Sequence, residues 1–351
     1  MKKYIGLDVH AASTTLAVVG ESGKRLKSHV VETTGGALVE QIKSIAGEKF
    51  LCLEEGTQSA WLYEILSPHA KEVVVSMVLE RRGQKNDEED AYKLAEQLRT
   101  GAVKKQVFKE AGGFRTLREV ARVYSMIVQD SARAQNRIKS IYRSRGVPLA
   151  GEAAYSMTGR QPLLLQLPDA SRTAVMFLYE QFDAVEAIRT KAEKSLVAES
   201  HKHPISRTLE TCPGLGPIRV AQLLPIVVTP MRFRTKRQFW GYCGLGVVTQ
   251  SSSDWVPKEG GGWIRANVNK TRGLSRARSG TLKSIFKGAA MTVSTCHETD
   301  PLHRQYQRTM EAGTKPNLAR LTLARKIAAI TLSMWKTKEK YDSTRHRKES
   351  S

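Results

Sequence analysis

Hydrophobic positions in the first hundred residues form short apolar runs, separated by polar turns and by stretches in which apolar residues recur every three or four positions. Short apolar runs are typical of buried strands, and the three-to-four spacing is typical of amphipathic helices. The pattern predicts helices at residues 36–46, 60–66 and 87–99. It predicts strands at residues 4–9, 14–19, 26–32, 50–53 and 73–75. Three strands followed by alternating helices and strands indicate a mixed α/β sheet.

The middle of the chain has the spacing of long helices. Apolar residues recur at intervals of three and four from Leu117 to Ile141, which predicts one long helix. A second stretch of this kind includes Val175 and runs to about residue 198, after a break at residues 146–148. The spacing fits either a long antiparallel pair of helices or a coiled coil that joins two subunits.

The last third of the chain opens with two helices joined by a glycine turn. Residues 211–218 read Thr-Cys-Pro-Gly-Leu-Gly-Pro-Ile, and a helix is predicted to follow at residues 219–226. Backbone N–H groups at such a helix start can bind phosphate, so Gly214 and Gly216 are candidate nucleic-acid contacts. A plain tight turn is the alternative. Further on, the pattern predicts a Gly-rich hairpin at residues 260–262 and helices at residues 281–293 and 318–335.

Charge divides the chain into two parts. Lysine and arginine total 56 against 34 acidic residues, for a net charge of +22 over 351 residues. Residues 1–100 carry a net charge of −2, so residues 101–351 carry +24. A chain of this length predicts two or three domains, and so basic a second part indicates a polyanionic partner such as nucleic acid.

Several classes of protein are disfavoured. No apolar run approaches the roughly 18 residues of a membrane-spanning helix, so no membrane span is expected. The basic residues are spread over the second part rather than along one amphipathic helix, so no membrane partner is expected either. The N-terminus turns acidic at Asp8 before any secretory apolar stretch, so no signal peptide is expected. The cysteines lie far apart without a CxxC spacing, which disfavours a zinc ribbon or disulfide scaffold and fits a reducing, cytoplasmic location. They are Cys52, Cys212, Cys243 and Cys296.

Four carboxylates in the first part form a candidate metal site. Asp8 interrupts an apolar strand, where a carboxylate is costly unless it is paired or binds metal. Glu54 ends another buried run, with Glu55 after it as an alternative. Asp87 and Asp90 are three positions apart and therefore share a helix face. Taken singly, Glu54 could simply end a strand, Asp87 could cap a helix and Asp90 could be a solvated charge. Together, four hard oxygen donors suit Mg²⁺ or Mn²⁺.

A serine cluster in the basic part is the second candidate site. Residues 250–255 read Gln-Ser-Ser-Ser-Asp-Trp, between an aromatic-glycine segment and the Gly-rich turn. Serine runs are usually loops, and a hydroxyl is a weak nucleophile unless it is activated. Basic residues that could clamp phosphates, or be ordinary surface charges, follow closely. They are Arg265, Lys270, Arg272, Arg276, Arg278 and Lys283. Four tryptophans are expected in the core rather than as base-stacking platforms: Trp61, Trp240, Trp263 and Trp335.

Five motifs, in this order, resemble those of the DEDD transposases of bacterial insertion sequences, the group that includes bridge-RNA-guided serine recombinases. They are Gly6-Leu7-Asp8-Val9, Glu54-Glu55-Gly56-Thr57, Lys85-Asn86-Asp87-Glu88-Glu89-Asp90-Ala91, Pro213-Gly214-Leu215-Gly216-Pro217, and Tyr242-Cys243-Gly244-Leu245 leading to Ser251-Ser252-Ser253. The resemblance spans nearly the whole chain. Each motif is weak alone, and the shared order makes the set specific.

The resemblance implies a fold and a domain order. A RuvC-like head with a ribonuclease H fold would occupy residues 1–105, and a helical coiled coil residues 106–203. A mainly α C-terminal transposase domain, with the helix-hairpin-helix and the serine, would occupy residues 204–340, before a charged tail at residues 341–351. Asp8, Glu54, Asp87 and Asp90 would form the acidic tetrad. The family pattern puts the nucleophile eight residues after Gly244, at Ser252. A serine follows Ser252 where the pattern has glycine, so Ser251 stays an alternative.

The implied function is that of a transposase or recombinase. It would cut and rejoin DNA strands of an insertion sequence through a covalent phosphoserine, with Mg²⁺ or Mn²⁺ on the tetrad. The implied partners are donor and target DNA, a structured guide RNA, and further copies of the chain in a dimer or tetramer.

Three other functions remain open. A RuvC-like hydrolytic DNA junction nuclease would use water in place of serine and form no covalent adduct. An actin-like sugar kinase also opens on Ile-Gly-Leu-Asp, but it needs a glycine-threonine phosphate loop where this chain has His10-Ala11-Ala12-Ser13-Thr14. A non-catalytic DNA-binding protein would tolerate Asp8→Ala.

Overall fold

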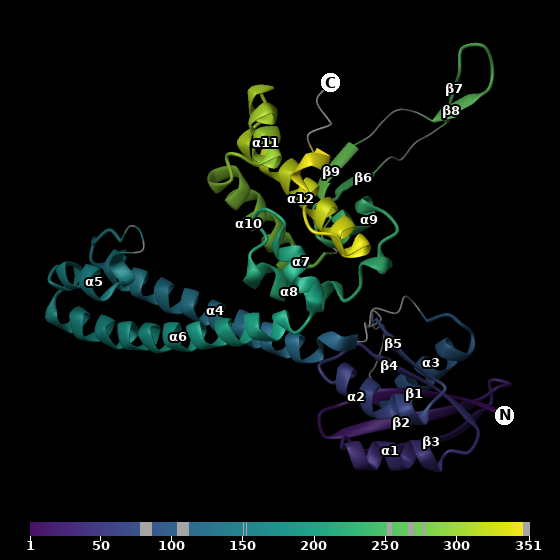
Figure 1. Ribbon diagram of the computed structural model, residues 1–351. Helices are drawn as coiled ribbons and strands as arrows, with labels where there is room; N and C mark the ends of the chain where they lie inside the picture. The colour runs from purple at the N-terminus through teal and green to yellow at the C-terminus, as the bar shows by residue number, and fades with distance from the viewer. Residues whose placement is uncertain are drawn as a thin grey trace. The chain divides into compact units, whose positions relative to one another are not determined.

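The computed structural model divides the chain into two compact units, Met1–Glu110 and Ala111–Ser351 (Figure 1). The first unit is α/β and the second is mostly helical. The structure describes residues 1–77, 86–103, 112–149, 151, 153–250, 255–265, 270–275 and 278–346. Within these ranges, no helix is long and apolar enough to cross a membrane.

A mixed five-stranded sheet forms the centre of the first unit. Its strands are β1 (Lys2–Val9), β2 (Ser13–Gly20), β3 (Arg25–Glu32), β4 (Glu48–Glu54) and β5 (Glu72–Ser76), in the spatial order β3-β2-β1-β4-β5. Strands β1 to β3 are antiparallel, whereas β4 and β5 run parallel to β1. All five predicted strands are therefore confirmed, and each is one to three residues longer than predicted.

Helices cover both faces of this sheet (Figure 1). Helices α1 (Gly35–Ser44) and α2 (Ser59–Leu66) pack on one face, where Leu38 and Leu62 share a core with Ile5 and Leu7. Helix α3 (Asp87–Arg99) packs on the other face, where Ala91 and Ala95 meet Ala17 and Val19 of β2. Successive strand residues point to opposite faces, so the two layers contact alternating positions of β1 and β2.

The second unit begins with two long helices, α4 (Arg115–Ser144) and α6 (Asp169–His201). Two hydrogen bonds show that these helices run in opposite directions. Tyr124, early in α4, donates to Glu193, late in α6, whereas Arg145, at the end of α4, donates to Ser171, early in α6. The helices are therefore antiparallel within one chain, the first of the two arrangements that the sequence allowed. Helix α5 (Met157–Leu164) lies in the connection between them, where Arg160 forms a 2.7 Å ion pair with Asp183.

Among the described residues, six further helices build the body of the second unit around one apolar core, which includes Leu223, Phe239, Phe286 and Ile327. They are α7 (Pro204–Glu210), α8 (Pro217–Val227), α9 (Lys236–Tyr242), α10 (Gly280–Cys296), α11 (Pro301–Glu311) and α12 (Pro316–Thr337). Two small antiparallel ribbons pair β6 (Val247–Gln250) with β9 (Lys270–Leu274), and β7 (Trp255–Pro257) with β8 (Trp263–Arg265). Short 3₁₀ turns are η1 (Ser67–His69), η2 (Gly112–Phe114), η3 (Ala153–Tyr155), η4 (Pro230–Arg232) and η5 (Ser343–His346).

Most predicted elements of the second unit are confirmed. Helices α8, α10 and α12 and the Gly-rich hairpin lie where predicted, whereas helices α5, α9 and α11 and the β6–β9 ribbon were not predicted. The expectation that Trp263 is a core residue is wrong, because 65% of its surface is exposed. The faces of its hairpin are not covered by the described parts of the chain. Trp335, by contrast, is buried in the core.

Candidate active site

Asp8 lies near the end of β1, on the face that α3 covers. Strand alternation places it on the same side as Gly6, while Ile5 and Leu7 point into the core with α1 and α2. Only 6% of Asp8 is exposed, and its buried Oδ2 accepts no hydrogen bond from the described residues. Burying a charged oxygen is costly when no hydrogen bond stabilises it, and among the described residues only the imidazole of His10, 3.3 Å away, faces it. The residue therefore fits a role in which a cation completes its surroundings.

Gly6 allows α3 to approach β1 closely. A Cβ added at Gly6 would lie 1.9 Å from the carbonyl oxygen of Ala91 and 2.7 Å from the backbone nitrogen of Ala95, both in α3. No other residue has room at this position. The close approach brings the first turn of α3, where Asn86 caps the backbone N–H groups of Glu88 and Glu89, to the end of β1.

Asp87, the first residue of α3, meets Asp8 through a histidine. The Nε2 atom of His10 is 3.3 Å from Asp8 Oδ2 and 3.3 Å from Asp87 Oδ2. One ligand atom from each of the three residues lies within 4.8 Å of the other two. Imidazole nitrogen and carboxylate oxygen are both ligands of divalent transition metals, so this cluster fits a cation such as Mn²⁺.

His10 was not predicted as a site residue. The signal in the sequence was its spacing, because residues two apart on an extended strand share a face and Asp8-Val9-His10 places His10 beside Asp8. That signal is weak without the position of α3, which supplies Asp87.

Glu54 and Glu55 border the same site. In the parallel pairing of β1 with β4, Leu7 is opposite Leu53, so Glu54 follows directly beside Asp8. Glu54 also shares a face with Cys52, which packs against α3. Both glutamates line a cavity of about 270 Å³ together with Asp8 and His10. Strand alternation therefore favours Glu54 over Glu55 as the residue on the side of Asp8.

Asp90, like Glu54, lies outside the three-residue cluster, and it does not line the cavity either. Its carboxylate lies 3.0 Å from the Nζ atom of Lys93 on the same helix. It shares the first turn of α3 with Asp87. The structure thus groups Asp8 and Asp87 with His10, adds Glu54 along the cavity, and pairs Asp90 with a lysine.

The other two acidic residues of this turn tie α3 to β3. Arg25 donates two hydrogen bonds to Glu89, at 2.6 and 2.9 Å, and Ser28 donates one of 2.5 Å to Glu88. The guanidinium of Arg25 also lies 4.4 Å from the ring centre of Tyr92. The hydrogen bond from Arg25 lowers the pKa of Glu89. These contacts hold the first turn of α3 beside the sheet.

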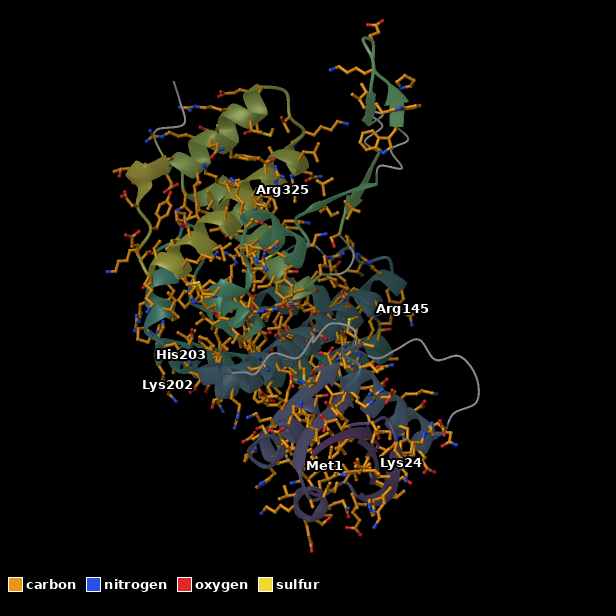
Figure 2. The ribbon with its side chains drawn as sticks, turned by 90° about the vertical axis from the view of Figure 1, so that its right-hand side faces the viewer. Met1, Lys24, Arg145, Lys202, His203 and Arg325 are labelled. Carbon is orange, nitrogen blue, oxygen red and sulfur yellow. The ribbon has the colours of Figure 1, made fainter. Side chains whose placement is uncertain are left out.

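The predicted nucleophiles, Ser251 and Ser252, lie outside the described residues, as does Arg276. The segment that leads to them is well anchored. Arg325 of α12, labelled in Figure 2, donates a 2.7 Å hydrogen bond to the carbonyl of Leu245, and Trp240 donates one of 2.8 Å to the carbonyl of Arg325. Strand β6 begins two residues after Leu245.

The predicted glycine turn lies between α7 and α8. Gly214 has a φ of +78°, and a Cβ there would come within 2.5 Å of the carbonyl oxygen of Ala289 in α10, so packing alone requires a glycine. Gly216 precedes α8, and a Cβ there would meet nothing within 4 Å. Arg219, in the first turn of α8, donates a 2.6 Å hydrogen bond to the carbonyl of Gly214. Gly216 is therefore the glycine whose backbone can approach a phosphate.

Cations gather at the start of α10. Burial, Arg278 and Lys287 together lower the pKa of Lys283. Like charges held this close favour an anion between them. Arg265 lies on β8, and Lys270 and Arg272 lie on β9.

Two models of known protein families match the chain. Residues 5–144 match the family model for transposases of the IS110 DEDD type, described as "Transposase". Residues 206–307 match the model described as "Transposase IS116/IS110/IS902 family". The two matches cover most of the chain and include all four predicted carboxylates and the serine cluster. A search of curated proteins found no match. The chain therefore belongs to the IS110-type transposases and is an enzyme that acts on DNA.

Proposed function

We propose that this transposase cuts and rejoins DNA through a serine nucleophile and a divalent cation held by Asp8, Asp87 and Glu54, with Asp90 as the fourth member of the tetrad. The observation that carries the metal site is the buried Oδ2 of Asp8, which accepts no hydrogen bond from the described residues and lies 3.3 Å from His10 Nε2 beside Asp87. The strand order of the first unit supports a RuvC-like, ribonuclease H fold for this head.

The residues of the chain have distinct tasks at this site. Asp8 is fixed by its strand, and Asp87 by the Asn86 cap and by the close contact of α3 with Gly6. Mg²⁺ or Mn²⁺ at these carboxylates would neutralise charge on the DNA phosphate. Lys93, 3.0 Å from Asp90, holds that carboxylate in its present place. Asp90 therefore joins the other carboxylates only if it leaves Lys93.

The serine step conserves a phosphate ester bond. The hydroxyl oxygen of Ser252, or of Ser251, forms a bond to the DNA phosphorus, and the bond from phosphorus to one deoxyribose oxygen breaks. The departing oxygen takes up a proton as the serine loses one, which leaves a phosphoserine and a free hydroxyl end. Reversal with a different DNA hydroxyl rejoins the strand, so no external energy source is needed.

Carboxylates from the first unit and a serine from the second must meet at one DNA strand. They do so either within a chain or between subunits, and the resemblance to DEDD transposases supports a dimer or tetramer. The net charge of +24 over residues 101–351 supports binding of DNA and of a structured guide RNA, through release of counterions. The proposed nucleic-acid contacts are Gly214, Gly216, Arg265, Lys270, Arg272, Arg276 and Lys283.

A nicking assay tests this proposal. The probe is end-labelled DNA that carries the gene with its flanking sequence. We expect a protein–DNA adduct that survives detergent, and we expect Asp87→Asn to lose it while DNA binding is preserved. If Ser251→Ala and Ser252→Ala each leave the adduct intact, neither serine is the nucleophile. Nicked DNA without any adduct would favour the hydrolytic nuclease instead.

A further inference from the structure

A small hairpin directly after the serine cluster exposes apolar side chains to solvent. Strands β7 and β8 pair with each other, and every residue from 255 to 264 is exposed. Trp263 retains 65% of its accessible surface and Trp255 retains 58%. In Figure 2 the side chains of the hairpin, drawn over the green ribbon, stand apart from those of the helices.

Both tryptophans lie on the same face of the hairpin. Directly opposite residues of an antiparallel pair share a face, and so do residues two apart on one strand. Trp263 is opposite Pro257, and Pro257 is two residues from Trp255. The other face carries Val256 opposite Ile264, which are 37% and 47% exposed. One face of the hairpin therefore presents two indole rings and a proline.

Exposed tryptophan side chains are unusual on a hairpin that binds nothing. A two-stranded hairpin on its own is at best marginally stable in water. Two exposed indoles add an apolar area of the kind that marks an interaction site. The hairpin is therefore suited to a partner that covers its tryptophan face.

Charge around the hairpin indicates which partner. Residues 255–280 contain six lysines and arginines but one acidic residue, Glu259. A second protein surface would have to bury these charges, whereas DNA supplies both phosphates and flat bases. Indole rings stack on bases of any sequence, provided that the bases are unpaired.

We propose that Trp255 and Trp263 stack on unpaired DNA bases beside the strand that is cut. The inference rests on the proposed function, because it takes the neighbouring serine cluster to lie at the cleaved phosphate. Trp255 follows Ser252 by only three residues along the chain. The stacked rings keep the cut end separated from its complementary strand.

The test measures binding of the full chain to two fluorescein-labelled single strands in EDTA, where cleavage is not involved. One probe is an oligothymidine of about 20 nucleotides, and the other is the same backbone with abasic sites in the centre. We expect Trp263→Ala and Trp255→Ala each to weaken binding to the first probe by about tenfold, and to leave binding to the abasic probe nearly unchanged. Trp263→Phe keeps a ring and should restore most of the affinity.

Phe177→Ala is the matched control. Phe177 is 64% exposed on α6, so this variant also removes an exposed aromatic ring, and we expect neither affinity to change. An equal loss on both probes would overturn the proposal in favour of backbone contacts. An unchanged affinity of the double tryptophan variant would also overturn it, as would a shift in oligomeric state on gel filtration in place of a loss of binding.

The two proposals fail separately. Normal tryptophan effects without a covalent adduct in the nicking assay would reject the serine mechanism and leave the hairpin contact standing. An adduct that forms normally, combined with no tryptophan effect on binding, would reject only the hairpin contact.

Discussion

Replacing Gly6 by alanine tests whether the close contact of β1 with α3 positions the acidic residues. The added Cβ would lie 1.9 Å from the Ala91 carbonyl oxygen and 2.7 Å from the Ala95 nitrogen, and both are backbone atoms that cannot rotate away. Real Cβ contacts are essentially never shorter than 3.0 Å. Helix α3 must therefore move from the sheet by about 1 Å or more, since the interior is close-packed.

This displacement acts on Asp87, at the start of the same helix. A shift of about 1 Å at a catalytic group costs about a hundredfold in rate, and overpacking costs about 1–3 kcal/mol of stability. We therefore expect Gly6→Ala to slow adduct formation about a hundredfold in the nicking assay, and to unfold at lower denaturant concentration. DNA binding by the second unit should persist.

Gly36→Ala is the matched control for this prediction. Gly36 lies in α1, and a Cβ there would meet nothing within 4 Å. The higher helix propensity of alanine should stabilise the chain by about 0.5–1 kcal/mol without an effect on activity. If Gly6→Ala behaves like Gly36→Ala in both assays, the reasoning from the close contact is refuted.

Three further predictions concern single groups. Asp8→Asn should abolish the adduct, because the proposed metal loses a carboxylate ligand and His10 Nε2 loses the charged oxygen that lies 3.3 Å from it. An adduct that still forms in the nicking assay would contradict this. His10→Ala should weaken binding of Mn²⁺ by about tenfold or more and binding of Mg²⁺ much less, because imidazole is a better ligand for Mn²⁺. Isothermal titration calorimetry with each metal measures the two affinities, and an equal loss of affinity for both metals would contradict the prediction. Burial raises the pKa of Cys52 to about 11, whereas Cys296 is exposed. Mass spectrometry should therefore find one iodoacetamide label on the native chain at pH 8 and four on the denatured chain. Rapid labelling of Cys52 in the native chain would contradict its burial in the sheet.

The first unit was largely predictable because its elements carry their own boundaries. Gly20 and Gly23 separate β2 from β3, and Asn86 caps α3. Apolar runs between such boundaries have few alternatives, so all five strands followed from the pattern. Helix α11 was missed although Asp300 caps it and Pro301 opens it, because its apolar face is narrow.

The site was predictable only in part. Strand ends and a helix start pointed to Asp8, Glu54 and Asp87, because carboxylates are unusual at such positions. His10 became part of the cluster only through the position of α3, and Asp90 was found paired with Lys93. The pairing of Asp90 with Lys93 is one that a three-residue spacing on a single helix allows. The contact of His10 with Asp87 instead depends on which side chain the neighbouring α3 presents.

The amino-acid sequence by itself determined the α/β head, the long helices, the basic second part and the order of the chemical motifs, since these depend on local periodicity and on charge. The tertiary structure alone decided that α4 and α6 fold back on each other, that Gly6 brings α3 onto β1, and that Trp263 faces solvent. The physical reason is that burial and close contact belong to pairs of elements. The residue pattern of one helix or strand does not show which other element packs against it.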